Sequence, residues 1–130
     1  MRIWGRDPSN AQEAAGQLNQ ETGVHCIRVP DVESGASGAD IISSATPAEE
    51  PLLRGAWVGP GTHIDLVGAY KPTMCEADAD VIAKANRVFV DTMDGAKDEA
   101  GDLIQAEQAG VFSFDAVSYT HLTLPTNREV

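Results

Sequence analysis

The hydrophobic positions of this chain fall into short runs that are separated by longer polar segments. Five runs rich in Val, Ile and Leu are bounded by Gly, Pro, Asn or Asp, a pattern typical of buried strands. The expected strands occupy residues 2–5, 24–29, 39–46, 62–68 and 87–92.

The segments between these runs have helical features. In 7–23, "DPSNAQEAAGQLNQETG", Asp7 or Ser9 can act as the N-cap and Gly23 as the stop after the last turn. Small residues repeat on one side, as expected for a helix that lies close to a sheet. This stripe comprises Ala11, Ala14, Ala15 and Leu18.

Further helical segments are expected at 31–38 (a short helix or turn), 75–86 and 95–110. Strands that alternate with helices indicate βαβ units. The sequence therefore predicts an α/β fold with a mostly parallel sheet and helices on both of its faces.

Composition narrows the class of protein. With 130 residues and 42% hydrophobic residues, the chain can form one domain. The formal charge of −11 argues against a nucleic-acid or anionic-membrane partner, and no apolar run is long enough to span a bilayer. Without an export signal, we expect a cytoplasmic protein in which Cys26 and Cys75 are reduced, a disulfide between them being the alternative.

Three of the expected strands end in residues suited to a ligand. These ends are Gly5-Arg6-Asp7, the segment from Ser43 to Pro47, and the segment from Val67 to Tyr70. Ligands of open α/β sheets bind outside the carboxyl ends of the strands, and small residues there let a flat ligand lie on the backbone. The alternative for Gly68 alone is a tight turn before Pro72.

The glycine-rich G-x-G-x-x-G turn of a dinucleotide site is absent from the sequence. The chain begins where the second strand of such a unit would lie. Two interpretations remain open: a different three-layer α/β domain, or a Rossmann domain without its first βα unit.

Several segments resemble the ornithine cyclodeaminase/mu-crystallin family. They are "RIWGRDP", "ADIISSATPAEEPLLRGAWVGPGTHIDLVGAYKPTMCEADADVI", "RVFVDT" and "GAKDEAGDLIQA". The resemblance implies a partial Rossmann-type, doubly wound α/β domain over 1–117, with flanking helices and without its first βα unit. Residues 118–130 look like a non-native tail without function. The family resemblance further implies that the full-length parent binds NAD(P) and is a homodimer, and that this fragment is itself inactive.

The resemblance also indicates a reaction. Cyclodeaminases of the family carry an aspartate two residues after the glycine of the fourth-strand loop, where this chain has Tyr70. A phenol does not replace a carboxylate base at neutral pH. "DLVGAYKPTM" is more similar to reductases of the cyclic imino acids Δ1-pyrroline-2-carboxylate and Δ1-piperideine-2-carboxylate, with Tyr70 as the candidate catalytic residue. Cyclodeaminase, amino-acid dehydrogenase and non-catalytic mu-crystallin-like NADPH binding remain alternatives.

The cofactor side chains are expected at the strand ends. Arg6 takes the place at the end of the first strand where NAD-specific sites carry an acid, and suits the 2′-phosphate of NADPH. NADH is the alternative cofactor, and a surface ion pair with Asp7 or Glu13 is the alternative role of Arg6. Neither the two cysteines nor His25 and His63 have the spacing of metal ligands, so no metal site is expected. The other expected cofactor contacts are Ser44, Ala45, Thr46, Val67, Gly68 and Ala69.

Overall fold

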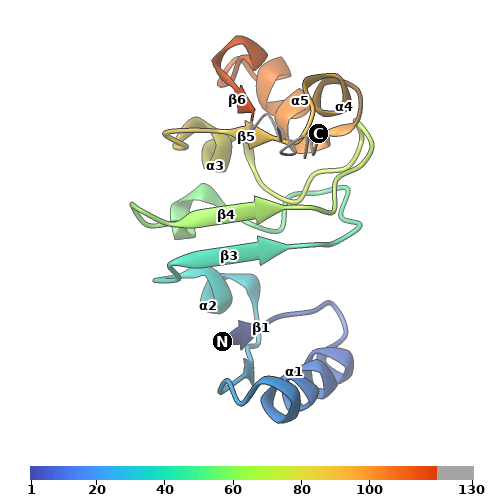
Figure 1. Ribbon diagram of the computed structural model, residues 1–130, viewed down its shortest axis with the longest axis vertical. Helices are drawn as coiled ribbons and strands as arrows, with labels where there is room; N and C mark the ends of the chain where they lie inside the picture. Colours follow the sequence, from blue (N-terminus) through green and yellow to red (C-terminus); the bar gives the residue numbers. More distant parts are fainter. Residues whose placement is uncertain (120–130) are drawn as a thin grey trace, which may run out of the picture.

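The computed structural model describes residues 1–119, and in this part helices and short strands alternate along the chain (Figure 1). All paired strands are parallel, which confirms the predicted α/β class. The strands are β1 Arg2–Ile3, β2 Ile27–Arg28, β3 Ile41–Ser44, β4 His63–Leu66, β5 Phe89–Val90 and β6 Ser118–Tyr119. The helices are α1 Pro8–Thr22, α2 Val32–Ala36, α3 Ala79–Ala83, α4 Met93–Glu99 and α5 Gly101–Gln108, with 3-10 turns η1 Gly55–Trp57 and η2 Phe114–Ala116.

The described strands form three parallel pairs, β1–β2, β3–β4 and β5–β6. The longest ladder joins β3 to β4, from Ile41 opposite His63 to Ser44 opposite Leu66. All five predicted strands are present, each shorter than the run that predicted it. A sixth strand, β6, lies at the start of the segment assigned to a tail, so the proposed boundary after Val117 stays a prediction.

Helix α1 forms as its sequence indicates. The side chain of Asp7 accepts hydrogen bonds from the backbone N–H groups of Ser9 and Asn10, so Asp7 and not Ser9 is the N-cap. Gly23 ends the helix with a φ of 70°, a conformation that glycine adopts without strain. Ala11 and Ala15 of the small-residue stripe are buried, as expected for close packing on the β1–β2 pair.

Strands β3 and β4 are covered on one face. Alternate side chains, among them Ile42 and Ile64, pack on a core of residues from α2, α3 and the loop between β3 and η1. The opposite face is open: Ile41 is 70% exposed. Helices therefore cover only one face of this strand pair, whereas the sequence analysis expected both. The buried residues of this core are Ala36, Leu53, Ala77 and Val81.

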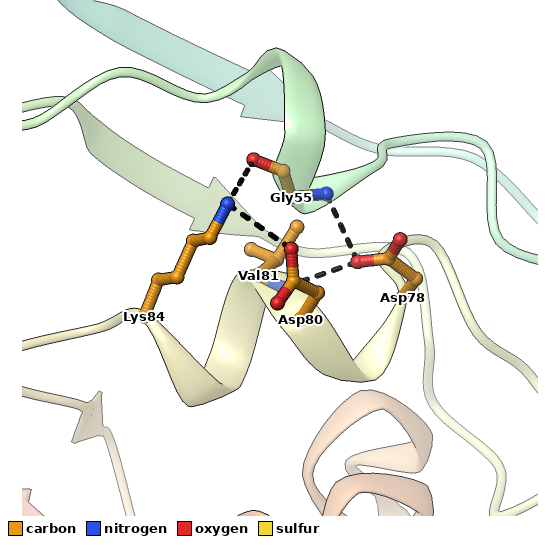
Figure 2. A network of polar contacts seen from close by, with 5 residues as sticks. All are labelled: Gly55, Asp78, Asp80, Val81 and Lys84. Carbon is orange, nitrogen blue, oxygen red and sulfur yellow. Dashed lines mark hydrogen bonds and ion pairs between the residues drawn. The ribbon is translucent and has the colours of Figure 1, made fainter.

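A polar network fixes η1 on α3 (Figure 2). The carboxylate of Asp78 caps α3 by accepting from the N–H of Val81, and it also accepts from the N–H of Gly55 at 3.0 Å. Lys84 donates to the Gly55 carbonyl and pairs with Asp80. A Cβ at position 55 would lie 2.8 Å from the backbone carbon of Asp80, so only glycine allows this approach.

The predicted last helix, 95–110, is two helices. Helix α4 ends before Ala100 and α5 begins at Gly101. Gly101 packs against the chain before α3, where a Cβ would lie 1.9 Å from the carbonyl oxygen of Met74. Both helices contribute to a second core, and its buried residues are Ile82, Ala96, Leu103, Ala106 and Phe114.

The helix predicted over 75–86 also begins later, at Ala79. Its first residues are extended instead, since Ala77 forms a parallel bridge with Leu53. In the described part, no helix has the length and apolarity needed to cross a bilayer. Cys26 and Cys75 are both buried and free, and the prediction that they are reduced thiols stays a prediction.

Candidate functional site

The two central strand ends lie side by side, as the sequence analysis expected. The N–H of Val67, directly after β4, donates to the carbonyl of Ser44, the last residue of β3, at 2.9 Å. Ala45 and Val67 are exposed beyond these strands, and Val67 is 68% exposed. The carboxyl ends of β3 and β4 therefore form one accessible edge.

The buried carboxylate of Glu76 connects the two strand ends. Glu76 is completely buried. One of its oxygens accepts from the hydroxyl of Ser44 at 2.7 Å and from the N–H of Thr46 at 2.5 Å. The other oxygen accepts from the N–H of Gly68 at 2.6 Å. Hydrogen bonds to an ionised carboxylate are stronger than neutral ones, so Glu76 fixes the spacing between the two loops.

Position 68 requires glycine for a structural reason that the sequence did not reveal. A Cβ at this position would lie 2.0 Å from the carbonyl oxygen of Thr46 and 2.7 Å from the carboxyl carbon of Glu76. The space that a side chain would take is therefore filled by the neighbouring loop. Glycine is therefore required at position 68 by the close approach of this loop, and the role of Gly68 as a ligand contact stays a prediction.

A second buried carboxylate supports the first. One oxygen of Asp102, in the first turn of α5, accepts from the N–H groups of Glu76 and Ala77, both at 2.8 Å. Burial raises the pKa of Asp102, and the two backbone N–H groups oppose this rise. Asp102 belongs to "GAKDEAGDLIQA", one of the segments that carry the family resemblance, and its partners show that it holds the chain segment that carries Glu76.

The thiol beside this pair is not a nucleophile. Burial, followed by the charge of Asp102, raises the pKa of Cys75 to about 12. Its sulfur donates to the carbonyl of Ala77 at 2.9 Å. A reactive cysteine needs a lowered pKa and access to solvent, so Cys75 serves packing.

Tyr70, the predicted catalytic residue, lies beyond the β4 end and is 59% exposed. The Lys71 ammonium is 5.5 Å from the centre of its ring. Within the described residues, no hydrogen bond or buried acid positions the phenol. Tyr70 thus follows the carboxyl end of β4 as an exposed residue, and its catalytic role stays a prediction.

Arg6 follows β1 and is exposed. In residues 1–119 the ion pairs are His63 with Asp65 and Lys84 with Asp80. The alternative role of Arg6, an ion pair with Asp7 or Glu13, therefore has no support in the described chain. Within residues 1–119 the guanidinium makes no ion pair that would compete with an anionic ligand.

Sequence reasoning missed Glu76. The run "CEADAD" is typical of an exposed first helical turn, and nothing in a single sequence marks one of its acids as buried. The available signal was weak: Glu76 follows the apolar pair Met74 and Cys75, and all residues from 74 to 77 are buried.

Residues 1–118 match the ornithine cyclodeaminase/mu-crystallin family. The chain belongs to this family. Its fold is the Rossmann-type α/β fold of the reductases and dehydrogenases that it resembles, which confirms the predicted fold.

Individual relatives are reductases. The chain is 38% identical over 119 residues to the Delta(1)-pyrroline-2-carboxylate reductase of Paracoccus denitrificans, with 90% of this chain and 36% of that protein covered. It is 36% identical over 104 residues to the ketimine reductase mu-crystallin of Rattus norvegicus, with 80% and 32% covered.

A solved structure shows the same likeness. The Delta(1)-pyrroline-2-carboxylate reductase of Thermococcus litoralis, in complex with NADH and L-proline, superposes with a TM-score of 0.86 at 28% identity. The superposition covers 91% of this chain and 36% of that one. The chain thus spans about a third of the length of the relatives described here.

Proposed function

We propose that this chain is part of an NAD(P)H-dependent reductase that converts Δ1-pyrroline-2-carboxylate or Δ1-piperideine-2-carboxylate to proline or pipecolate. The observation that carries the proposal is the joint likeness, in sequence and in structure, to two pyrroline-2-carboxylate reductases. Tyr70, in place of the aspartate of cyclodeaminases, supports reduction over deamination. Because the chain spans about a third of its relatives, the working enzyme is proposed to be a longer protein. The family resemblance supports the further proposal that this protein is a homodimer.

The residues present fit one part of a dinucleotide. Arg6 is exposed and has no ion pair in the described chain, which suits a 2′-phosphate and favours NADPH, with NADH as the alternative. The exposed residues Ala45 and Val67 beside the two strand ends suit the flat nicotinamide half. We place the cofactor contacts at the residues predicted from sequence, namely Arg6, Ser44, Ala45, Thr46, Val67, Gly68 and Ala69.

In this proposal the cofactor supplies a hydride to the C=N carbon when it is bound. The residues of this chain hold the parts of the site in position. Glu76 holds the loops of Thr46 and Gly68 at a fixed spacing, since a small misalignment of the reacting atoms costs rate. Tyr70 donates a hydrogen bond at the open edge of the site.

The test is an assay of NADPH oxidation by the longer protein with each cyclic imino acid. We expect oxidation with one or both, and no release of ammonia from ornithine. Ammonia release from ornithine at a comparable rate would show a cyclodeaminase and overturn the proposal.

A second candidate is a mu-crystallin-like protein that binds NADPH without turnover. The absence of a hydrogen-bonded position for Tyr70 within the described residues favours it, whereas the mu-crystallin of Rattus norvegicus is itself named a ketimine reductase. Tight NADPH binding without oxidation in the same assay would select this candidate.

A further inference from the structure

The loop of residues 70–74, which we call the Tyr70 loop, follows the carboxyl end of β4. Tyr70 is 59% exposed, and within the described residues its phenol makes no hydrogen bond. The loop backbone is closed by a turn in which the N–H of Met74 donates to the carbonyl of Lys71 at 3.0 Å. Because the phenol has no partner in the described chain, its direction depends on how the backbone of the Tyr70 loop is held.

The side chain of Gln105, in α5, binds two carbonyls of the Tyr70 loop. Its amide nitrogen donates to the carbonyl of Pro72 at 3.0 Å and to the carbonyl of Met74 at 3.3 Å. A primary amide carries two N–H donors, so one side chain can serve both carbonyls. Gln105 is half-buried, and both hydrogen bonds described for its side chain go to this loop.

The first turn of α5 supports the same loop by direct contact. Gly101 lies four residues before Gln105 and therefore on the same face of the helix. A Cβ at position 101 would lie 1.9 Å from the carbonyl oxygen of Met74 and 2.5 Å from that of Lys71. The loop backbone thus rests on the start of α5, and Gln105 holds it one turn further along.

Helix α5 is fixed independently of these contacts. Leu103 and Ala106 are buried in the second core, and Gln105 is not part of that core. Asp102 holds the chain that follows the loop, through the N–H of Glu76. Replacing the amide of Gln105 should therefore release the Tyr70 loop while the helix and the Glu76 segment stay in place.

We propose that Gln105 is a positioning residue for the reduction. By binding the carbonyls of Pro72 and Met74 it holds the Tyr70 loop on α5, and this fixes the phenol of Tyr70 beside the carboxyl end of β4, where the cyclic imino acid reacts. Gln105 acts through Tyr70 and touches neither the substrate nor the cofactor. The inference rests on the proposed function, since it assigns a part in that reaction.

The test compares steady-state kinetics of three variants of the longer protein. Gln105→Met keeps the length of the side chain and removes both donors, whereas Gln105→Lys keeps a donor group. Gln108→Met is the matched control, because Gln108 is an exposed residue of the same helix. We expect Gln105→Met to lower kcat roughly 10- to 100-fold, as a misplaced reacting group does. Gln105→Lys should recover most of this loss, and the control should keep the wild-type kcat.

The KM for NADPH should stay nearly unchanged in Gln105→Met, because Glu76 and not Gln105 holds the backbone at Gly68. A second substitution shows whether Gln105 acts through the phenol. In a Tyr70→Phe background, Gln105→Met should cause little further loss of kcat, since the group that it positions is already absent. The same fold loss in both backgrounds, or no loss from Gln105→Met alone, would overturn the proposal.

Hydrogen exchange of the 130-residue chain reports on the loop without catalysis. Peptides that cover residues 70–76 should exchange faster in Gln105→Met than in the wild type or in Gln108→Met. Equal exchange in this segment would contradict the holding of the loop by Gln105. If exchange rises over the whole chain, the methionine has unfolded it, and Gln105→Ala, with its high helix propensity, replaces it in both measurements.

The wild-type protein separates the two proposals. If it oxidises NADPH with neither cyclic imino acid, the proposed function fails, and the role of Gln105 in reduction fails with it. If the wild type reduces an imino acid and Gln105→Met behaves like Gln108→Met, the proposed function stands and the positioning role alone is wrong.

Discussion

Replacing Glu76 by Gln should loosen the strand ends that carry the candidate site. In the structure, one oxygen of Glu76 accepts from Ser44 and Thr46 and the other from Gly68. A glutamine can keep the first two bonds through its carbonyl oxygen. Its NH2 group would then face the N–H of Gly68, so that two donors meet in a buried place.

The magnitude follows from these contacts. One charge-assisted hydrogen bond, worth about 1.5–3 kcal/mol, is lost, and a buried N–H is left without a partner. The bonds that remain also lose their charge. We expect the free energy of unfolding to fall by roughly 2–5 kcal/mol, a large part of the about 5–15 kcal/mol typical of a domain.

The assay is urea denaturation of the 130-residue chain, followed by circular dichroism. Glu50→Gln is the matched control, because Glu50 is exposed and the chemical change is the same. The control should shift stability by less than about 0.5 kcal/mol. Equal midpoints and slopes for the two variants would refute the inference that Glu76 holds the loops together.

Four further predictions concern single groups or the chain alone. In the longer protein, Arg6→Asp should raise the KM for NADPH roughly 10- to 100-fold and leave the KM for NADH nearly unchanged. An equal rise of both KM values would show that Arg6 does not contact the 2′-phosphate. The same rise caused by the control Arg87→Asp, at another exposed arginine, would show this as well. The pKa of Asp102 is raised in the folded state, so the folded chain binds more protons than the unfolded chain and wild-type stability falls as pH rises above 3.8. Asp102→Asn has no such titration. It should therefore be more stable than wild type at pH 7, and this advantage should shrink as pH falls toward 3.8. A lower, pH-independent stability of Asp102→Asn would contradict this. Cys75, with its pKa raised to about 12, should resist iodoacetamide at pH 8 until the chain unfolds; rapid alkylation of the folded chain would argue against its burial. Calorimetric titration of the 130-residue chain should show weak or no NADPH binding, since a glycine-rich phosphate turn is absent from its sequence; micromolar binding would contradict the fragment interpretation.

The alternation of strands and helices along the chain was predictable because it depends on local sequence signals. Asp7, Gly23 and the alanines of α1 act within a few residues of sequence, and the structure confirms each of them. The strand ends followed from the general rule that parallel strands share a carboxyl edge. Their proximity at Ser44 and Val67 is therefore a consequence of topology.

The features that were not predicted from the sequence depend on contacts between distant segments. The break at Ala100 arises where α5 meets the backbone of Met74, which no helical periodicity encodes. Glu76 is buried because the loop of Gly68 and the first turn of α5 close around it. Such burial of a charge requires several tertiary donors at once, and these become visible only in three dimensions.

The most direct test of the proposed reduction follows the hydride. The longer protein would be incubated with Δ1-pyrroline-2-carboxylate, or in a parallel reaction with ornithine, and with NADPH that carries deuterium at both positions of C4 of the nicotinamide. The proline formed would be analysed by mass spectrometry. The account predicts proline that carries a single deuterium at its α-carbon, with the proton on nitrogen coming from solvent. Unlabelled proline, or labelled NADPH left unconsumed while ornithine yields proline and ammonia, would contradict it.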